Sequence, residues 1–170
     1  MSVFVINHCT VTPVRQEPSE GSEQLTQLLF SEVCEVLDRL PRWTKIRSTL
    51  DGQEGWVDFK MLTSASNLSP LTYHLPTTVV ATPIAIATEM ETGEELRLTL
   101  GTRLPNYAHG TFEVLGRQYL IDPDCVSSTE TTGLLGGKAK GEKVCAVAQT
   151  LLNAPYLWGG KNAMGMDCSG

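Results

Sequence analysis

Residues 43–57 read Trp-Thr-Lys-Ile-Arg-Ser-Thr-Leu-Asp-Gly-Gln-Glu-Gly-Trp-Val, and this stretch decides how the first part of the chain folds. Large and polar residues alternate over 43–50, Asp51-Gly52 is a typical turn pair, and Gly55–Asp58 can return as a strand. The stretch therefore predicts a β-hairpin.

The segment before this hairpin is compatible with strands or with a helix. Residues 11–15 form one strand candidate, and residues 24–37 hold enough Leu, Val and Phe for two more strands. Several aliphatic residues of 24–37 also fit helical spacing, so local periodicity leaves both structures open. The hairpin favours strands, and we predict a small all-β unit over about residues 9–62.

A second group of strand patterns follows a stretch rich in Ser, Asn and Thr at residues 63–70. The turn Leu115-Gly116-Arg117 separates the last two of these patterns. We predict a second small barrel whose strands lie at residues 79–87, 96–100, 111–114 and 118–121.

Residues 127–140 are rich in Ser, Thr and Gly, which is typical of a linker. Residues 142–152 place apolar side chains on one helical face, and Pro155 ends the helix. Cys145 lies beside that face, and we interpret it as a small buried hydrophobic residue. The predicted domains are residues 1–63, 64–126 and 141–170, with the linker at 127–140.

The overall composition excludes several classes of protein. The chain has 170 residues and a net charge of -6, without a basic cluster, which argues against binding to nucleic acid. No stretch is long enough to span a membrane, and the first residues do not form a signal peptide. The 5 cysteines are widely spaced, which suits neither disulfides nor a metal site. We expect a cytoplasmic protein without a cofactor, or an exported one if a leader has been removed.

The last residues, 154–170, end in Asp167-Cys168-Ser169-Gly170. Asp167 can cap the first turn of a helix there, which would place Cys168 where free amide groups stabilise a thiolate. A carboxylate beside a thiol has the opposite effect and raises its pKa, so Asp167 must have a separate role. This pattern predicts a reactive Cys168.

The chain resembles known families at both ends. Thr-Pro-Val-Arg at 12–15, Trp-Thr-Lys-Ile-Arg at 43–47 and Asp-Gly-Gln-Glu-Gly-Trp-Val at 51–57 resemble a bacterial SH3 domain. In relatives with this layout, the first SH3 domain covers the active site. The candidate loop here is 51–54, where this sequence has Gln53 in place of the aromatic residue of several relatives. We hypothesise that Asp51 or Glu54 faces a substrate ammonium group, and a solvated turn is the alternative.

Pro-Tyr-Leu-Trp-Gly-Gly at 155–160 and Met-Asp-Cys-Ser-Gly at 166–170 resemble the opening of an NlpC-type cysteine peptidase domain. The resemblance implies a mainly β chain: two SH3-like barrels, then the first helix and nucleophile segment of a papain-like α+β peptidase domain. It also implies that Cys168 is the nucleophile.

The same resemblance implies roles for the neighbours of Cys168. Asp167 holds the free amino group of the substrate, a role compatible with capping, and Ser169 is either a substrate contact or a small helical residue. The Tyr156 hydroxyl stabilises developing negative charge, unless the ring only packs.

The expected activity is cleavage of the γ-D-glutamyl to diamino-acid bond in murein stem peptides with a free N-terminal L-Ala. The family's base is a downstream His, which is not among these 170 residues, and His8, His74 and His109 all precede the thiol. We therefore expect this chain alone to be inactive. The alternative is a non-catalytic module of tandem SH3-like domains that binds wall peptides.

Overall fold

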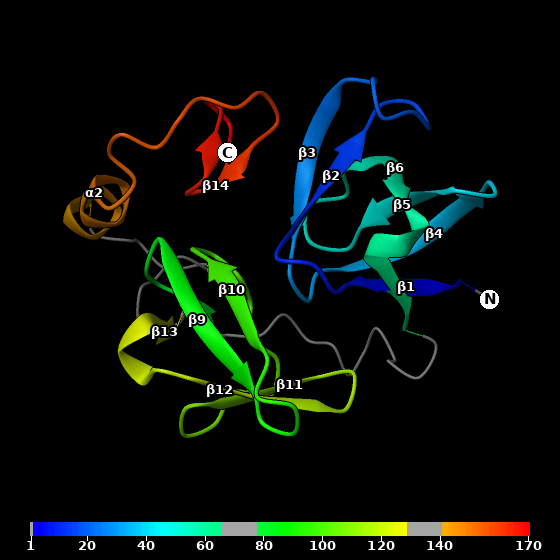
Figure 1. Ribbon diagram of the computed structural model, residues 1–170. Helices are drawn as coiled ribbons and strands as arrows, with labels where there is room; N and C mark the ends of the chain where they lie inside the picture. Colours follow the sequence, from blue (N-terminus) through cyan, green and yellow to red (C-terminus); the bar gives the residue numbers. More distant parts are fainter. Residues whose placement is uncertain (1, 66–77, 129–140) are drawn as a thin grey trace. The chain divides into compact units, whose positions relative to one another are not determined.

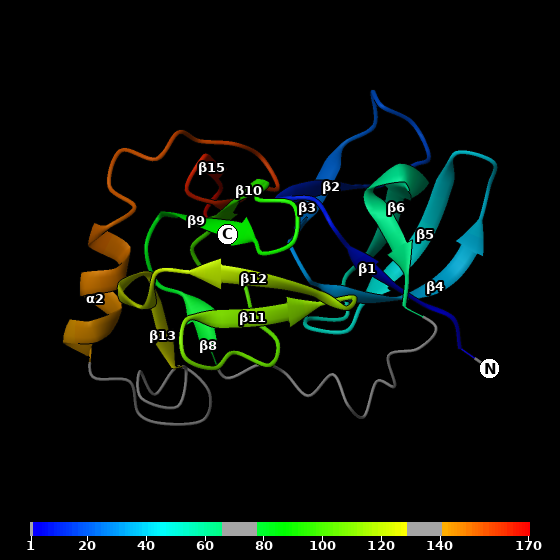
Figure 2. The ribbon, with the colours of Figure 1, turned by 60° about the horizontal axis from the view of Figure 1, so that its bottom comes forward.

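The computed structural model describes residues 2–65, 78–128 and 141–170 of the chain, drawn as ribbons in Figures 1 and 2. The chain divides into two compact units. Unit 1 comprises residues 1–74 with 156–161 and 166–170, and unit 2 comprises residues 75–155 with 162–165. The predicted third domain, 141–170, is thus shared between both units.

Unit 1 is built on an antiparallel sheet of seven strands in the order β3-β2-β6-β5-β4-β1-β7. The short helix η1 (Phe59–Met61) lies between β6 and β7 in the chain. Residues 24–37 form strands and not a helix, as predicted. The strands are β1 (Phe4–Asn7), β2 (Val11–Arg15), β3 (Gln24–Leu29), β4 (Val33–Arg39), β5 (Trp43–Ser48), β6 (Glu54–Asp58) and β7 (Leu62–Ser64).

The predicted hairpin is confirmed by the pairing of β5 with β6, in which Lys45 lies opposite Trp56. Its turn is closed by a hydrogen bond from the Ser48 amide to the Gln53 carbonyl at 2.9 Å. Gly52 adopts φ 74°, a backbone conformation that glycine reaches without steric cost. The Asp51 carboxylate accepts the Gln53 amide at 3.0 Å, and this bond fixes the side chain at the tip of the turn.

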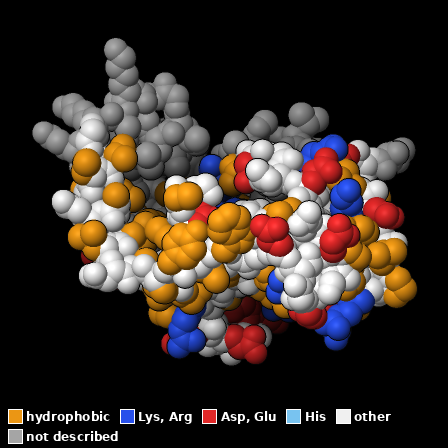
Figure 3. All heavy atoms as spheres, turned by 90° about the horizontal axis from the view of Figure 1, so that it is seen from above, with side chains coloured by type: hydrophobic (Ala, Val, Ile, Leu, Met, Phe, Trp, Pro, Cys, Tyr) orange, Lys and Arg blue, Asp and Glu red, His pale blue; other side chains and the backbone are white. Residues whose placement is uncertain are grey.

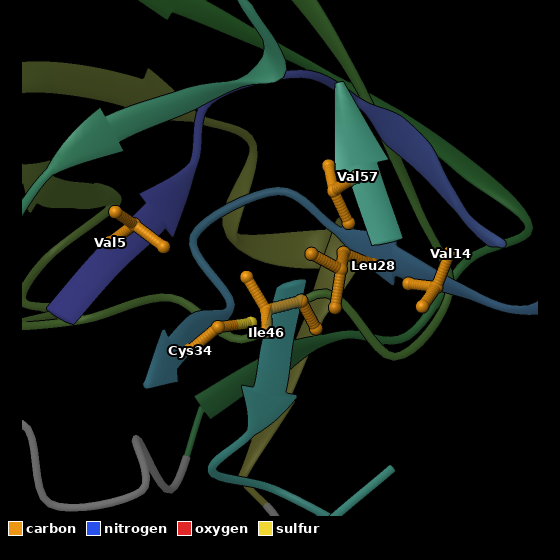
Figure 4. Packing of buried hydrophobic residues seen from close by; sticks show 6 residues of the cluster. All are labelled: Val5, Val14, Leu28, Cys34, Ile46 and Val57. Carbon is orange, nitrogen blue, oxygen red and sulfur yellow. The ribbon is translucent and has the colours of Figure 1, made fainter. Parts of the chain in front are cut away.

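The core of unit 1 is small and aliphatic. Alternate residues of the strands point inward, and the central cluster consists of Val5, Val14, Leu28, Cys34, Ile46 and Val57 (Figure 4). Trp43 is also buried. The hydrophobic burial of these side chains is the main stabilisation of the unit.

Strand β1 lies before the predicted start of this unit near residue 9. It pairs with both β4 and β7. Asn7, at its end, is fully buried. Its side-chain amide donates to the carbonyls of Cys9 and Leu29, and its oxygen accepts from Thr12. These bonds satisfy a buried polar group, so β1 is an integral part of the fold.

Burial has a measurable chemical consequence for Cys34. Removal from water, with a smaller contribution from the Glu32 charge, raises the pKa of this thiol to about 12. Because only thiolates react, alkylation of Cys34 at pH 8 should be about 1000-fold slower than that of an ordinary cysteine. Exposed Cys145 is the internal reference. Iodoacetamide labelling followed by peptide mass spectrometry measures both rates, and equal rates without denaturant would contradict the packing of Cys34.

Unit 2 contains a four-stranded antiparallel sheet in the order β10-β9-β12-β11 and a ribbon of β8 with β13. Figure 2 shows β11 and β12 side by side, where Phe112 stacks on Tyr119 with ring centroids 5.0 Å apart. The elements are β8 (Thr78–Val80), β9 (Ile84–Glu89), β10 (Glu95–Thr99), β11 (Thr111–Val114), β12 (Arg117–Ile121), the short helix η2 (Pro123–Cys125), β13 (Val126–Ser128) and α2 (Gly141–Gln149).

The structure changes two details of the sequence prediction for unit 2. The strand expected at 79–87 is divided into β8 and β9, because Pro83 between them has no amide hydrogen for a ladder bond. Ser127 and Ser128, assigned to the linker, pair with β8. The rest of that linker, residues 129–140, lies outside the described residues, and the domain boundaries stay predictions.

Helix α2 confirms the helix predicted near the end of the chain, although it ends at Gln149 and is followed by turns up to Asn153. Asn153 adopts φ 68°, and Pro155 follows. The prediction that Cys145 is buried is wrong, because Cys145 is exposed, as are the apolar Val144 and Val147 on this helix. Within the described parts of the chain, no helix is long and apolar enough to cross a membrane.

Candidate active site

The site is built around the turn of residues 167–170, which we call the Asp167 turn. The Asp167 carboxylate accepts the amide of Ser169 at 2.9 Å and its hydroxyl at 2.8 Å. The bond to the amide two residues on closes a local turn, and the helix start that the sequence suggests at Asp167 stays a prediction. Cys168, between these two residues, is exposed. The turn thus presents a thiol to solvent on an ordered backbone.

A second set of bonds ties this turn to the Gly-Gly pair. The other Asp167 oxygen accepts the Gly159 amide at 2.8 Å, and the Asp167 amide donates to the Gly160 carbonyl at 3.1 Å. The hairpin of β14 (Lys161–Asn162) and β15 (Gly165–Met166) connects the two segments. Residues 159–160 and the Asp167 turn therefore form one hydrogen-bonded assembly.

The hydrogen bonds also explain the charge state of Asp167. Bonds from the Ser169 hydroxyl, the Ser169 amide and the Gly159 amide, in decreasing order of effect, lower the pKa of Asp167 below its usual value. A carboxylate with its pKa lowered in this way stays ionised at neutral pH. The Asp167 turn thus carries a fixed negative charge beside the thiol.

The C-terminal segment docks on the edge strand β3 of the first unit (Figure 1). The Trp158 indole donates to the Glu23 carboxylate at 2.8 Å, and the Gln24 side-chain amide donates to the Trp158 carbonyl at 2.8 Å. The Lys161 amide donates to the side-chain oxygen of Gln27 at 3.1 Å. Residues more than 130 positions apart in the sequence are thereby joined.

A largely buried ion pair completes this docking. Lys161 Nζ lies 3.0 Å and 3.1 Å from the two oxygens of Glu32. Both side chains are mostly removed from solvent, with 17% of Lys161 and 8% of Glu32 exposed. Burial raises the pKa of Glu32, and the Lys161 charge and hydrogen bond act in the opposite direction.

A hollow of about 230 Å³ opens beside the Asp167 turn. Its wall combines the predicted residues Asp51, Asp167 and Ser169 with Gln53 of the hairpin turn and Lys161. Two acidic residues, Asp51 and Asp167, thus line the same hollow. Their predicted contact with a substrate ammonium group stays a prediction.

Glu54 and Tyr156, the other two predicted residues apart from Cys168, are not among the residues that line the hollow. Glu54 does not line the hollow, because Arg47 binds its carboxylate at 2.7 Å and holds it against the neighbouring strand β5. Tyr156 is bridged to Met166 through the backbone, and the residue is 68% exposed. Hydrophobic side chains gather on the face shown in Figure 3, and Leu157 and Trp158 are also exposed.

Two of the three histidines lie in the described part of the chain, at a strand end and in a loop. His8 is exposed, and its Nδ1 lies 3.0 Å from the Thr63 hydroxyl. His109 lies in a loop with φ 49°, and His74 falls outside the described residues. Among the residues that the structure describes, no group of His, Cys, Asp or Glu is arranged to hold a metal ion.

Five contact residues of this site had no signal in the sequence. Glu23, Gln24, Gln27 and Glu32 are polar residues of a barrel, and Lys161 is one residue beyond the Gly-Gly pair. Only the position of Lys161 close to the predicted motif could have drawn attention to it. These residues find their partners only when the C-terminal segment packs against β3, and the local sequence does not show this contact.

The fold and site together define a small β-barrel domain with a cysteine-bearing turn bound to its edge. Residues 10–66 match the family model of the bacterial SH3 domain, and we refer to the seven-stranded sheet of unit 1 as the SH3 domain.

The whole chain is similar to longer proteins. It is 27% identical over 157 residues to the γ-D-glutamyl-L-lysine dipeptidyl-peptidase of Bacillus subtilis (strain 168), a match that covers 85% of this chain and 50% of that protein. The chain therefore spans about half the length of the curated relative that it matches.

A crystal structure supports the same relationship at the level of the fold. The NlpC/P60 family protein from Bacillus cereus ATCC 10987 superimposes with a TM-score of 0.81 at 18% identity, covering 98% of this chain and 69% of that one. The predicted fold class is thereby confirmed, since the chain is mainly β and shares the fold of an NlpC/P60 protein.

Proposed function

We propose that the protein containing this chain is a cysteine peptidase that hydrolyses the γ-D-glutamyl to diamino-acid bond of peptidoglycan stem peptides. The observation that carries the proposal is the exposed Cys168 in a turn whose flanking residues, Asp167 and Ser169, line a hollow with Asp51. The similarity to a γ-D-glutamyl-L-lysine dipeptidyl-peptidase supports the choice of substrate.

The substrate's amino group would be recognised by the negatively charged carboxylate of Asp167. One oxygen accepts two hydrogen bonds from Ser169 and the other accepts one from Gly159. Together with the Gly170 amide, these bonds keep the carboxylate ionised, and its negative charge would attract the substrate's ammonium group. The Asp51 carboxylate adds a second negative charge on the wall of the hollow. A stem peptide with an unblocked N-terminal L-Ala would bind there through charge-assisted hydrogen bonds.

The chemistry would begin with the Cys168 thiol, whose proton passes to the histidine that the family resemblance places beyond these 170 residues, leaving the thiolate as nucleophile. The sulfur attacks the γ-carbonyl of D-glutamate, and the histidinium protonates the departing amine of the diamino acid. A water molecule, deprotonated by the same histidine, then attacks the thioester and releases L-Ala-γ-D-Glu. The exposed hydroxyl of Tyr156 would stabilise the oxyanion formed in these steps.

The test uses the full-length protein with L-Ala-γ-D-Glu-diaminopimelate and follows release of L-Ala-γ-D-Glu by chromatography. The wild-type protein should release the dipeptide, and the Cys168→Ala variant should show no release, because the nucleophile is absent. N-acetylation of the substrate should lower kcat/KM by about 100-fold, since the amide cannot bind the two carboxylates as an ammonium does.

Release by the Cys168→Ala variant would refute the assigned nucleophile. If the acetylated peptide were cleaved as fast as the free one, the role of Asp51 and Asp167 would be wrong. Binding of the peptide by the wild-type protein without any cleavage would favour the alternative, a wall-peptide-binding module.

A further inference from the structure

The ion pair between Glu32 and Lys161 joins the SH3 domain to the segment that carries Cys168. Glu32 lies between β3 and β4, where its own backbone is fixed: its amide donates to the Leu29 carbonyl at 3.2 Å and its carbonyl accepts the Asn7 amide at 2.9 Å. The carboxylate therefore projects from a rigid part of the SH3 domain. It is bound by Lys161, from the far end of the chain.

Lys161 is connected to the Asp167 turn through its two preceding residues. Its amide is held by Gln27, at 3.1 Å. The Gly160 carbonyl accepts the Asp167 amide, and the Gly159 amide binds the Asp167 carboxylate. A displacement of Lys161 must move both glycines, and through them both sides of Asp167. The residue after Asp167 is the exposed Cys168.

The energetics of the pair favour a geometric role over a stabilising one. Both ions are largely buried, and removing ions from water is costly enough that buried pairs often add little stability. The pKa of Glu32 is consistent with a small gain in stability, because burial raises this pKa even though Lys161 is in contact. The pair does restrict Lys161 to one position, since Glu32 binds it through both oxygens.

We infer that Glu32 and Lys161 are positioning residues, through which the SH3 domain holds the Asp167 turn and its thiol in place. The inference rests on the proposed function for its catalytic consequence only. The structural consequence can be measured in this chain without any activity.

The first experiment measures amide hydrogen exchange in the 170-residue chain. In Lys161→Met, the amides of Gly159, Asp167 and Ser169 should exchange about tenfold faster, because their segment opens locally more often. Lys161→Arg, which keeps the charge, should restore slow exchange. The matched control is Lys45→Met, which removes an exposed lysine 4.0 Å from Glu54 on the same domain and should leave these amides unchanged.

Core amides such as those of Ile46 and Val57 separate positioning from general stability. They should exchange at the wild-type rate in Lys161→Met. If core amides and the Asp167 turn are accelerated equally, the pair is only a stabilising contact, and the inference is overturned. Unchanged exchange at Gly159 and Asp167 in both Lys161→Met and Glu32→Gln would also overturn it.

The pH dependence of unfolding gives a second readout. Lys161 and Asp51 are the groups whose charges act on Glu32, and the neighbouring Cys34 thiol, whose pKa is about 12, is neutral in this pH range. Since the folded state raises the pKa of Glu32, its contribution to stability is fully present below the ordinary pKa and is lost as the pH rises through the folded value. Glu32→Gln should therefore gain stability relative to wild type as the pH rises above about 4.3. Its Asp167 turn should nevertheless exchange faster at pH 7.

In the full-length protein, Lys161→Met should lower kcat about tenfold, and Lys161→Arg should restore it. The two proposals fail separately. Activity that survives Cys168→Ala refutes the nucleophile and leaves the exchange result intact, whereas unchanged exchange refutes the positioning role even if Cys168 is essential.

Discussion

Replacing Gly159 with alanine is expected to detach the C-terminal segment from the SH3 domain and to lower kcat/KM of the full-length protein by about 100-fold. An added Cβ would lie 2.6 Å from the backbone oxygen of Gln24, which cannot move without disturbing β3. Gly159 also has φ 68°, where a side chain adds about 1–2 kcal/mol of strain. Clash and strain act on the same residue, whose amide binds Asp167.

Gly93→Ala is the matched control, because Gly93 has φ 74° but open space around the added Cβ. It carries the strain without the clash, and its activity should stay within about threefold of wild type. Exchange of the Lys161 amide, measured in the 170-residue chain, reports docking directly. Should Gly159→Ala retain both slow exchange and full kcat/KM, the docked position of this segment would be wrong.

Gly55→Ala should be the most destabilising single-methyl substitution that we consider in the SH3 domain. Gly55 is buried in β6, and an added Cβ would lie 2.5 Å from a methyl carbon of Val14 and 2.8 Å from the Arg15 carbonyl oxygen. Overpacking of this kind costs about 1–3 kcal/mol, a large part of the stability of a small domain. The exchange rate of the Val57 amide, measured at increasing urea concentrations, gives the loss in the free energy of unfolding.

Two further variants distinguish the cause. Gly21→Ala adds the same methyl group in open space and should change the free energy of unfolding by less than about 0.5 kcal/mol. Val14→Ala combined with Gly55→Ala removes one of the two clashes and should recover part of the loss, since the contact with the Arg15 carbonyl persists. Equal stability of Gly55→Ala and Gly21→Ala would show that β6 does not pack against β2 as described.

Much of the first unit could be predicted because its signals are local. The alternation in 43–50 and the Asp51-Gly52 turn specify β5 and β6, and residues 11–15 coincide with β2. The strand β1 was missed because its few apolar residues are too short to show a period, and its partners β4 and β7 lie far along the chain. The position of β1 is determined by its hydrogen bonds to β4 and β7, and not by a hydrophobic pattern in its own sequence.

The site shows the same division. The sequence identifies Cys168 and its neighbours from a short motif, but it treats Asp51 and Glu54 alike, because both belong to one turn region. The structure separates them: Asp51 lines the hollow, and Glu54 is bound to Arg47. The direction of a side chain depends on its partners across the sheet, which local sequence does not specify.

The sequence by itself determined the β-rich class of the chain, its SH3-like strands, the helix before Pro155 and the identity of the exposed thiol. These features depend on residues close together in the chain, through strand alternation, turn chemistry and capping. Only the tertiary structure decided that β3 binds the Cys168 segment, with Lys161 placed on Glu32 and Asp167 held by Gly159. The contacts of Glu32 and β3 join residues from opposite ends of the chain, and the burial and pairing of these side chains exist only when the two ends are packed together.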